Sequence, residues 1–70
     1  MVTLEKIKTR LAEAIHLSGL KQVEIAAKLN ISQPTVAQYL SGRALPSLDT
    51  FAKLCEILDV DPAYILCLSD

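Results

Sequence analysis

Residues 22–43 read QVEIAAKLNISQPTVAQYLSGR and contain two short helical patterns joined by a tight turn. The first helix is expected over about residues 21–29, and the second from Ser32 to just before Gly42. The turn between them spans only three or four residues, and Asn30 suits the left-handed backbone that such a turn needs. A connection this short forces the helices to cross sharply, and Ala26 permits their close approach.

The apolar residues of the two patterns are spaced for burial along one face of each helix. They are Ile25, Ala26 and Leu29 in the first helix and Val36, Tyr39 and Leu40 in the second. The start of the second helix leaves two alternatives, because Pro34 disfavours helical geometry at Gln33. Either Ser32 caps the helix, or Gln33 caps it and Pro34 is the first helical residue.

The polar face of the second helix carries amides and hydroxyls without charge. Its residues are Gln33, Thr35, Gln38 and Ser41, with Ala37 between them. A face that only meets water usually carries Lys and Glu. Glutamine can both donate to and accept from adenine, so this composition favours hydrogen bonding to the edges of DNA bases.

Three further helices are expected around this pair. One begins after Thr3 and ends at Gly19, one begins at the Ser47 cap, and the last begins at Asp61-Pro62. The apolar stripes comprise Leu4, Ile7, Leu11 and Ile15 in the first of these and Leu48, Phe51, Cys55 and Leu58 in the second. No segment alternates like a strand, so the sequence predicts one compact all-α domain of five helices over residues 1–70.

The composition excludes several classes of protein. Of the 70 residues 51% are apolar, which is too many for a disordered chain, and no apolar run is long enough to span a membrane. The N-terminal residues lack the apolar core of a signal peptide, so we expect a soluble cytoplasmic protein. Cys55 and Cys67 have no zinc-site spacing, and we expect reduced thiols. Without a metal or nucleophile–base constellation, we expect no enzyme, no cofactor and no small-molecule ligand.

The charge is divided unevenly along the chain. The formal net charge is −1, but residues 1–43 hold six Lys and Arg against three Glu, whereas residues 44–70 hold one Lys against five Asp and Glu. A protein binds phosphate with one face and not with its average charge. The N-terminal part, which contains the paired helices, is therefore the part expected to meet a polyanion.

Residues 22–43 resemble the helix-turn-helix of the Cro/cI-type (lambda-repressor-like) family of phage and bacterial transcriptional regulators. Pro46-Ser47-Leu48 and residues 54–60, LCEILDV, resemble the fourth helix of that family, and the resemblance covers nearly the whole chain. It implies a compact five-helix lambda-repressor-like domain with the motif at about 21–42. It also implies sequence-specific binding of double-stranded DNA by a regulator, which we expect to be a repressor, with the second helix of the motif in the major groove.

The resemblance also implies which residues touch DNA. The positions expected to contact bases are Gln33, Pro34 and Gln38, with Ser32, Thr35 and Ala37 beside them. The positions expected to contact phosphates are Gln22, Lys21, Ser41 and Arg43. Pro34 stands where a polar residue is frequent, so it is expected to replace a base hydrogen bond by an apolar contact. Three further positions differ from the family pattern. Lys21 replaces the usual Ser or Thr cap, Asn30 replaces a common glycine, and Leu40 replaces a frequent Glu.

The segment AYILCL, residues 63–68, is apolar almost all round. Ala63 and Leu66 are expected to complete the core, which leaves an exposed apolar patch. Its members are Ile57, Ile65, Cys67 and Leu68. We expect this patch to be the interface of a homodimer on a two-fold symmetric operator. A frayed end of the domain and a junction to another domain are the alternatives.

A second function remains open at this stage. The same helices could form an antitoxin-like or other helical protein-interaction module. DNA binding that weakens with salt would separate the two, because a protein-interaction module would bind no duplex.

Overall fold

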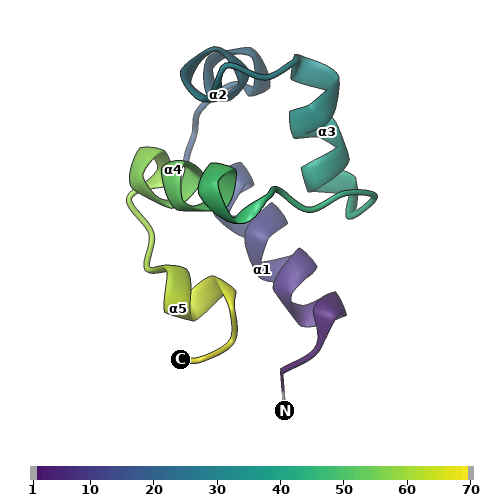
Figure 1. Ribbon diagram of the computed structural model, residues 1–70, viewed down its shortest axis with the longest axis vertical. Coiled ribbons are helices and arrows are strands. Elements are labelled where there is room, and N and C mark those ends of the chain that lie inside the picture. The colour runs from purple at the N-terminus through teal and green to yellow at the C-terminus, as the bar shows by residue number, and fades with distance from the viewer. Residues whose placement is uncertain (1, 70) are drawn as a thin grey trace.

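The computed structural model describes residues 2–69, which form five helices and no strand (Figure 1). The helices are α1 (Leu4–Leu17), α2 (Gln22–Leu29), α3 (Gln33–Ser41), α4 (Leu48–Leu58) and α5 (Pro62–Ile65). The expected all-α class with five helices is confirmed. α1 packs against α3 and α5, and α2 packs against α3 and α4. No helix within residues 2–69 has both the length and the apolar character that crossing a membrane requires.

Side chains cap the starts of three helices. Thr3 Oγ1 accepts a hydrogen bond from the Lys6 amide at 3.2 Å before α1, and Asp61 Oδ1 accepts one from the Ala63 amide at 2.9 Å before α5. Ser32 Oγ accepts one from the amide three residues later, so Ser32 is the cap of α3 and Pro34 lies in its first turn. Of the two alternatives for this helix, the first is therefore correct.

Left-handed residues end three of the helices. Asn30 ends α2 with φ 56°, and Gly42 ends α3 with φ 78°. Asp59 ends α4 in the same conformation, with φ 55°, although its sequence neighbourhood did not predict this. Asn and Asp tolerate this region because their short polar side chains bond locally, and glycine has no Cβ to clash there. The turn between α2 and α3 is therefore held by Asn30 as expected.

The core lies where α1, α2, α3, α4 and α5 converge. Its buried members are Leu11, Ile15, Ile25, Ala26, Leu29, Val36, Tyr39, Leu54, Cys55, Leu58 and Ile65. Two stripe residues expected to face inward do not: Leu4 is exposed, and Leu48 is 85% exposed. Leu54 is fully buried in place of Leu48. The other members of the expected stripe do face the core, because Cys55 and Leu58 are buried and Phe51 packs partly buried against them, so the expectation fails only at the first turn of α4.

The C-terminal segment does not expose all the residues of the expected dimer patch. Ile65 is 0% exposed and belongs to the core, so the expectation that it lies on the surface is wrong. Ile57 also packs partly buried against the core, and Cys67 is half-buried, whereas Leu68 remains exposed. The apolar run does not continue as a helix, because α5 ends at Ile65 and Cys67 takes a positive φ of 64°. The chain reverses there, and Ile65 turns inward.

Arg10 of α1 fastens this reversed segment. Its Nη1 donates to the Tyr64 carbonyl at 2.6 Å and to the Ser69 carbonyl at 3.1 Å. Its guanidinium also lies 4.3 Å from the centre of the Tyr64 ring, within the range of a cation–π contact. The Tyr64 carbonyl, which also accepts from the Cys67 amide, and the Ser69 carbonyl beyond α5 are thereby tied to α1.

Candidate nucleic-acid interface

α3 presents its polar face outward because two apolar side chains anchor its opposite face. Val36 is fully buried. Tyr39 is buried as well, and desolvation raises the pKa of its phenol. Gln33, Pro34 and Gln38 are exposed on the outer side. The three residues expected to read bases therefore share one accessible surface, on a helix whose inner side is held by the core.

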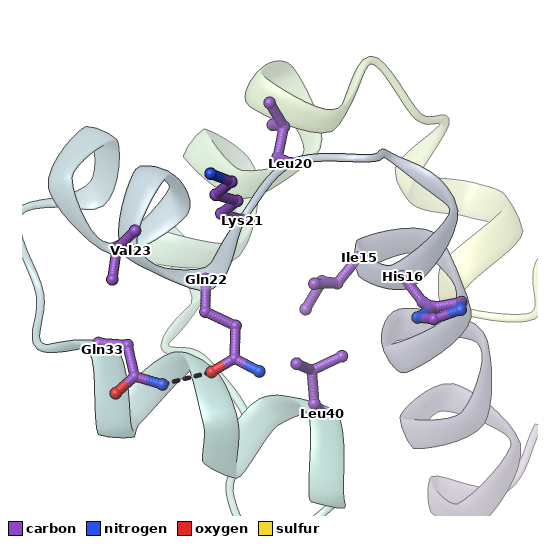
Figure 2. Close-up of a pocket in the computed structure, with 8 residues that line it drawn as sticks. All are labelled: Ile15, His16, Leu20, Lys21, Gln22, Val23, Gln33 and Leu40. Atoms are coloured by element: carbon purple, nitrogen blue, oxygen red, sulfur yellow. Dashed lines mark hydrogen bonds between the residues drawn. The ribbon is translucent and has the colours of Figure 1, made fainter.

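The side chains of Gln22 and Gln33 are hydrogen-bonded to each other. Gln33 Nε2 donates to Gln22 Oε1, which joins the first residue of α2 to the first residue of α3 (Figure 2). This bond leaves Gln22 with its amide nitrogen as a donor. It leaves Gln33 with one N–H and its carbonyl oxygen. A residue expected at a phosphate and a residue expected at a base thus form one unit.

A shallow hollow of about 440 Å³ lies beside this pair, between the end of α1 and the starts of α2 and α3. Its lining residues are Ile15, His16, Leu20, Lys21, Gln22, Val23, Gln33 and Leu40. Figure 2 shows the Gln22 side-chain nitrogen turned toward Leu40, while the Gln33 oxygen points away from the hollow. The hollow is lined by both polar and apolar side chains, and the Gln22 amide nitrogen that is not bonded to Gln33 lies in this open hollow.

The hydroxyls of α3 are engaged in local hydrogen bonds. Ser32 Oγ and Thr35 Oγ1 lie 2.7 Å apart, and Ser32 Oγ also accepts from the Thr35 amide. Ser41 Oγ donates to the Gln38 carbonyl at 3.1 Å. Ser32 and Thr35 therefore serve first as the cap of the helix, and the amides of Gln33 and Gln38 are the larger polar groups on this surface.

The loop after α3 is held to the helix by its backbone. The amides of Arg43 and Ala44 both donate to the Gln38 carbonyl, at 3.0 and 3.3 Å. These bonds close the end of α3 after Gly42 takes its left-handed conformation. The backbone of Arg43 is consequently held at the C-terminal end of α3, and its side chain is exposed there.

The helix-turn-helix family profile matches residues 5–65 of this chain, a range that includes most of α1 and all of α2 to α5. The chain belongs to the Cro/cI-type helix-turn-helix family. The family and the five-helix architecture together identify the fold as lambda-repressor-like. The protein is accordingly a DNA-binding transcription regulator whose partner is double-stranded DNA. No curated protein and no solved structure gives a significant match.

The residues expected to contact phosphates lie at both ends of α3. Lys21 and Gln22 lie at the start of α2, beside the N-terminal end of α3, while Ser41 and Arg43 lie at its C-terminal end. Lys21, Ser41 and Arg43 are exposed, and Gln22 is half-buried. The start of α2 is the positive end of a helix dipole, which attracts an anion.

Two features of this helix-turn-helix were missed in the sequence analysis. The bond between Gln22 and Gln33 joins residues 11 positions apart, and no periodicity within either helix predicts it. Lys8 of α1 lines a second hollow together with Ser41 and Gly42, where its ammonium lies 3.9 Å from the Glu5 carboxylate. A helical wheel of α1 could have found Lys8, because it lies three positions before the buried Leu11.

Proposed function

We propose that this domain inserts α3 into the major groove of a specific operator and acts as a repressor. The observation that carries the proposal is the hydrogen bond between Gln22 and Gln33. Through this bond Gln22, at the start of α2 where an anion is attracted, orients the Gln33 side chain that is proposed to read a base. Exposed glutamines usually lose considerable rotamer freedom on binding, and this pairing reduces that loss for Gln33.

The chemistry of Gln33 fits adenine. After one N–H is given to Gln22, the other N–H can donate to adenine N7, and the carbonyl oxygen can accept from the N6 amino group. Gln38 lies five residues further along α3 and is also exposed, so it can read a second base. Pro34 and Ala37 have apolar side chains on the same helix, and these suit the methyl group of thymine.

The expected phosphate contacts fix the position of α3 and carry no base preference. Gln22 donates with its remaining amide group, and Lys21, Ser41 and Arg43 act from the two ends of the reading face. Arg43→Ala should weaken binding to all duplexes about equally and lower the slope of log affinity against log salt by about one unit. An effect confined to one sequence would contradict this role.

A homodimer on a two-fold symmetric site is part of the same proposal. One copy offers a single nine-residue reading helix, and such a helix covers only a few base pairs. Two copies with their α3 helices about 34 Å apart would read two half-sites one turn of DNA apart. Occupancy of such a site excludes other proteins from the same DNA, which is sufficient for repression. A promoter reporter containing the selected site tests this, and activation instead of silencing would contradict it.

A double-mutant cycle tests the role of the glutamine pair on a duplex selected from a random library. Gln22→Ala, Gln33→Ala and the double variant should show a coupling of about 1 kcal/mol in binding free energy, because either single change breaks the shared bond. The matched control is the cycle of Gln22 with Gln38, a glutamine on the same helix that does not contact Gln22. That cycle should be additive within about 0.5 kcal/mol. Equal additivity in both cycles would refute the coupled reading unit.

A further inference from the structure

The hydrogen bond between Gln22 and Gln33 has a direction, and this direction decides which group of Gln33 faces outward. Gln33 Nε2 donates and Gln22 Oε1 accepts (Figure 2). The amide nitrogen of Gln22 lies in the open hollow, while the carbonyl oxygen of Gln33 points away from it. The pair therefore presents a donor beside the start of α2 and an acceptor on the outer side of α3.

A phosphate at the start of α2 would hold the pair in this direction. If both amides were reversed together, the Gln22 carbonyl oxygen would face the hollow in place of the amide nitrogen. Gln22 is the first residue of α2, at the positive end of the helix dipole, and Lys21 lines the same hollow. A phosphate bound there accepts from an N–H group and repels a carbonyl oxygen. The proposed phosphate contact thus keeps the oxygen of Gln33 outward.

The groups that Gln22 leaves free on Gln33 are an acceptor and one donor side by side. Adenine matches them in the major groove, because its N6 amino group lies next to the acceptor N7. Guanine presents two acceptors there, cytosine presents an amino group without a ring-nitrogen acceptor, and thymine presents no donor. Among the four bases, only adenine satisfies both free groups of Gln33.

The N6 amino group of a paired adenine has a single hydrogen to give to a protein. Its other hydrogen pairs with thymine, so a methyl group on N6 stands in the major groove where the hydrogen for Gln33 Oε1 would be. The methyl group removes the donor and adds bulk at the same point. An acceptor left without a donor in a dry contact costs affinity.

We propose that this regulator distinguishes methylated from unmethylated DNA, and that methylation of adenine N6 at the base read by Gln33 releases the protein from its site. The inference rests on the proposed reading of DNA by α3, and it adds the chemical state of the operator as the signal that controls binding.

Gln22 makes the distinction sharp. A glutamine without a partner could turn away from the methyl group and lose only its contact with the base. Gln33 would lose its bond to Gln22 as well, so turning away costs it two interactions. Gln38 is exposed on the same helix and is not bonded to Gln22, so its amide is free to turn.

The experiment measures binding to a duplex selected from a random library, in which each adenine is replaced in turn by N6-methyladenine. Methylation of one adenine in each half-site should lower the affinity of wild type by about tenfold or more, because a bidentate base contact is lost. Gln33→Ala should bind the duplexes with and without this methyl group equally well. Gln38→Ala is the matched control on the same helix, and it should keep the wild-type ratio at this adenine although its affinity for both duplexes falls.

Gln22→Ala tests the part played by the pair. It should weaken binding to the unmethylated duplex and lower the ratio between the two affinities, because Gln33 is then free to turn from the methyl group. A second probe is 2-aminopurine, which pairs with thymine but carries its amino group in the minor groove. It removes the N6 donor without adding a methyl group, so it should weaken wild type and leave Gln33→Ala unaffected.

Four outcomes would overturn the inference. They are a methylated duplex that wild type binds as tightly as the unmethylated one, a methylation effect that survives Gln33→Ala, a wild-type ratio in Gln22→Ala, and a selected base other than adenine at the position where Gln33→Ala relaxes the preference. A wild-type chain that binds no duplex contradicts the proposed function itself. A chain that binds its selected duplex and ignores methylation contradicts only this inference, so the two failures are distinguishable.

Discussion

Replacing Ile65 by alanine should destabilise the fold strongly, although this residue lies in a four-residue helix near the end of the chain. Ile65 is 0% exposed and is part of the core. Truncating a buried isoleucine to alanine removes its transfer free energy and leaves a cavity, at a cost of about 2–5 kcal/mol. We expect about 3 kcal/mol, because the short α5 can relax only partly while Arg10 holds it to α1.

This loss is large compared with the stability of the whole domain. A chain of 70 residues has a free energy of unfolding of about 4–10 kcal/mol. A loss of about 3 kcal/mol should lower the Tm by roughly 12–24 °C. Urea titration followed by far-UV circular dichroism measures the free energy directly, and an unchanged m-value would show that the same two states are compared.

Leu68→Ala is the control for this prediction, because Leu68 lies three residues further along and is 69% exposed. It should change the free energy of unfolding by no more than about 0.5 kcal/mol. An Ile65→Ala variant as stable as wild type would refute the assignment of Ile65 to the core. Equal losses for both variants would show that the whole C-terminal segment packs differently.

Three further predictions concern stability and thiol chemistry. Arg10→Met should lower the free energy of unfolding by about 1 kcal/mol, because the Ser69 carbonyl loses its Arg10 donor and the Tyr64 carbonyl keeps only its bond from the backbone, while the affinity for one DNA half-site should not change; a selective loss of DNA affinity would contradict this structural role. The hydrogen bond from the Ser47 hydroxyl lowers the pKa of Asp49 from its ordinary 3.8. The stabilisation that Asp49→Asn removes should therefore be present above pH 3.8 and vanish as the pH falls through the lowered pKa. A difference in urea midpoint between wild type and variant that persists in stronger acid would refute this. Burial raises the pKa of the Cys55 thiol, whereas Cys67 is only half-buried, so a thiol reagent should modify Cys67 first and reach Cys55 only as the protein unfolds; equal rates for the two thiols would contradict the core position of Cys55.

The helix-turn-helix itself could be predicted from short-range signals. The expected helix over about 21–29 is observed as Gln22–Leu29, and the helix expected from Ser32 to before Gly42 is observed as Gln33–Ser41. Caps, left-handed turns and apolar spacing act over about four residues, so each signal can be read without knowing the rest of the chain.

The face that each helix buries was less predictable. Both Leu48 and Leu54 are apolar residues of α4, yet only Leu54 is buried. The spacing within α4 allows either choice, because its apolar residues extend more than halfway around the helix. Which of the two is buried depends on how the other helices pack around α4. The same reasoning applies to the candidate site, where the residues on α3 could be proposed but the bond from Gln33 to Gln22 could not.

The sequence by itself determined the five helices, the tight turn at Asn30 and the polar face of α3, because each follows from interactions between residues only a few positions apart. Only the tertiary structure decided that Ile65 is buried, that Leu48 is exposed and that Arg10 bonds to the Ser69 carbonyl 59 residues away. The physical reason is that burial is a competition. A domain this small has space for only some of its apolar side chains, and the combined packing of all the helices determines which of them leave water.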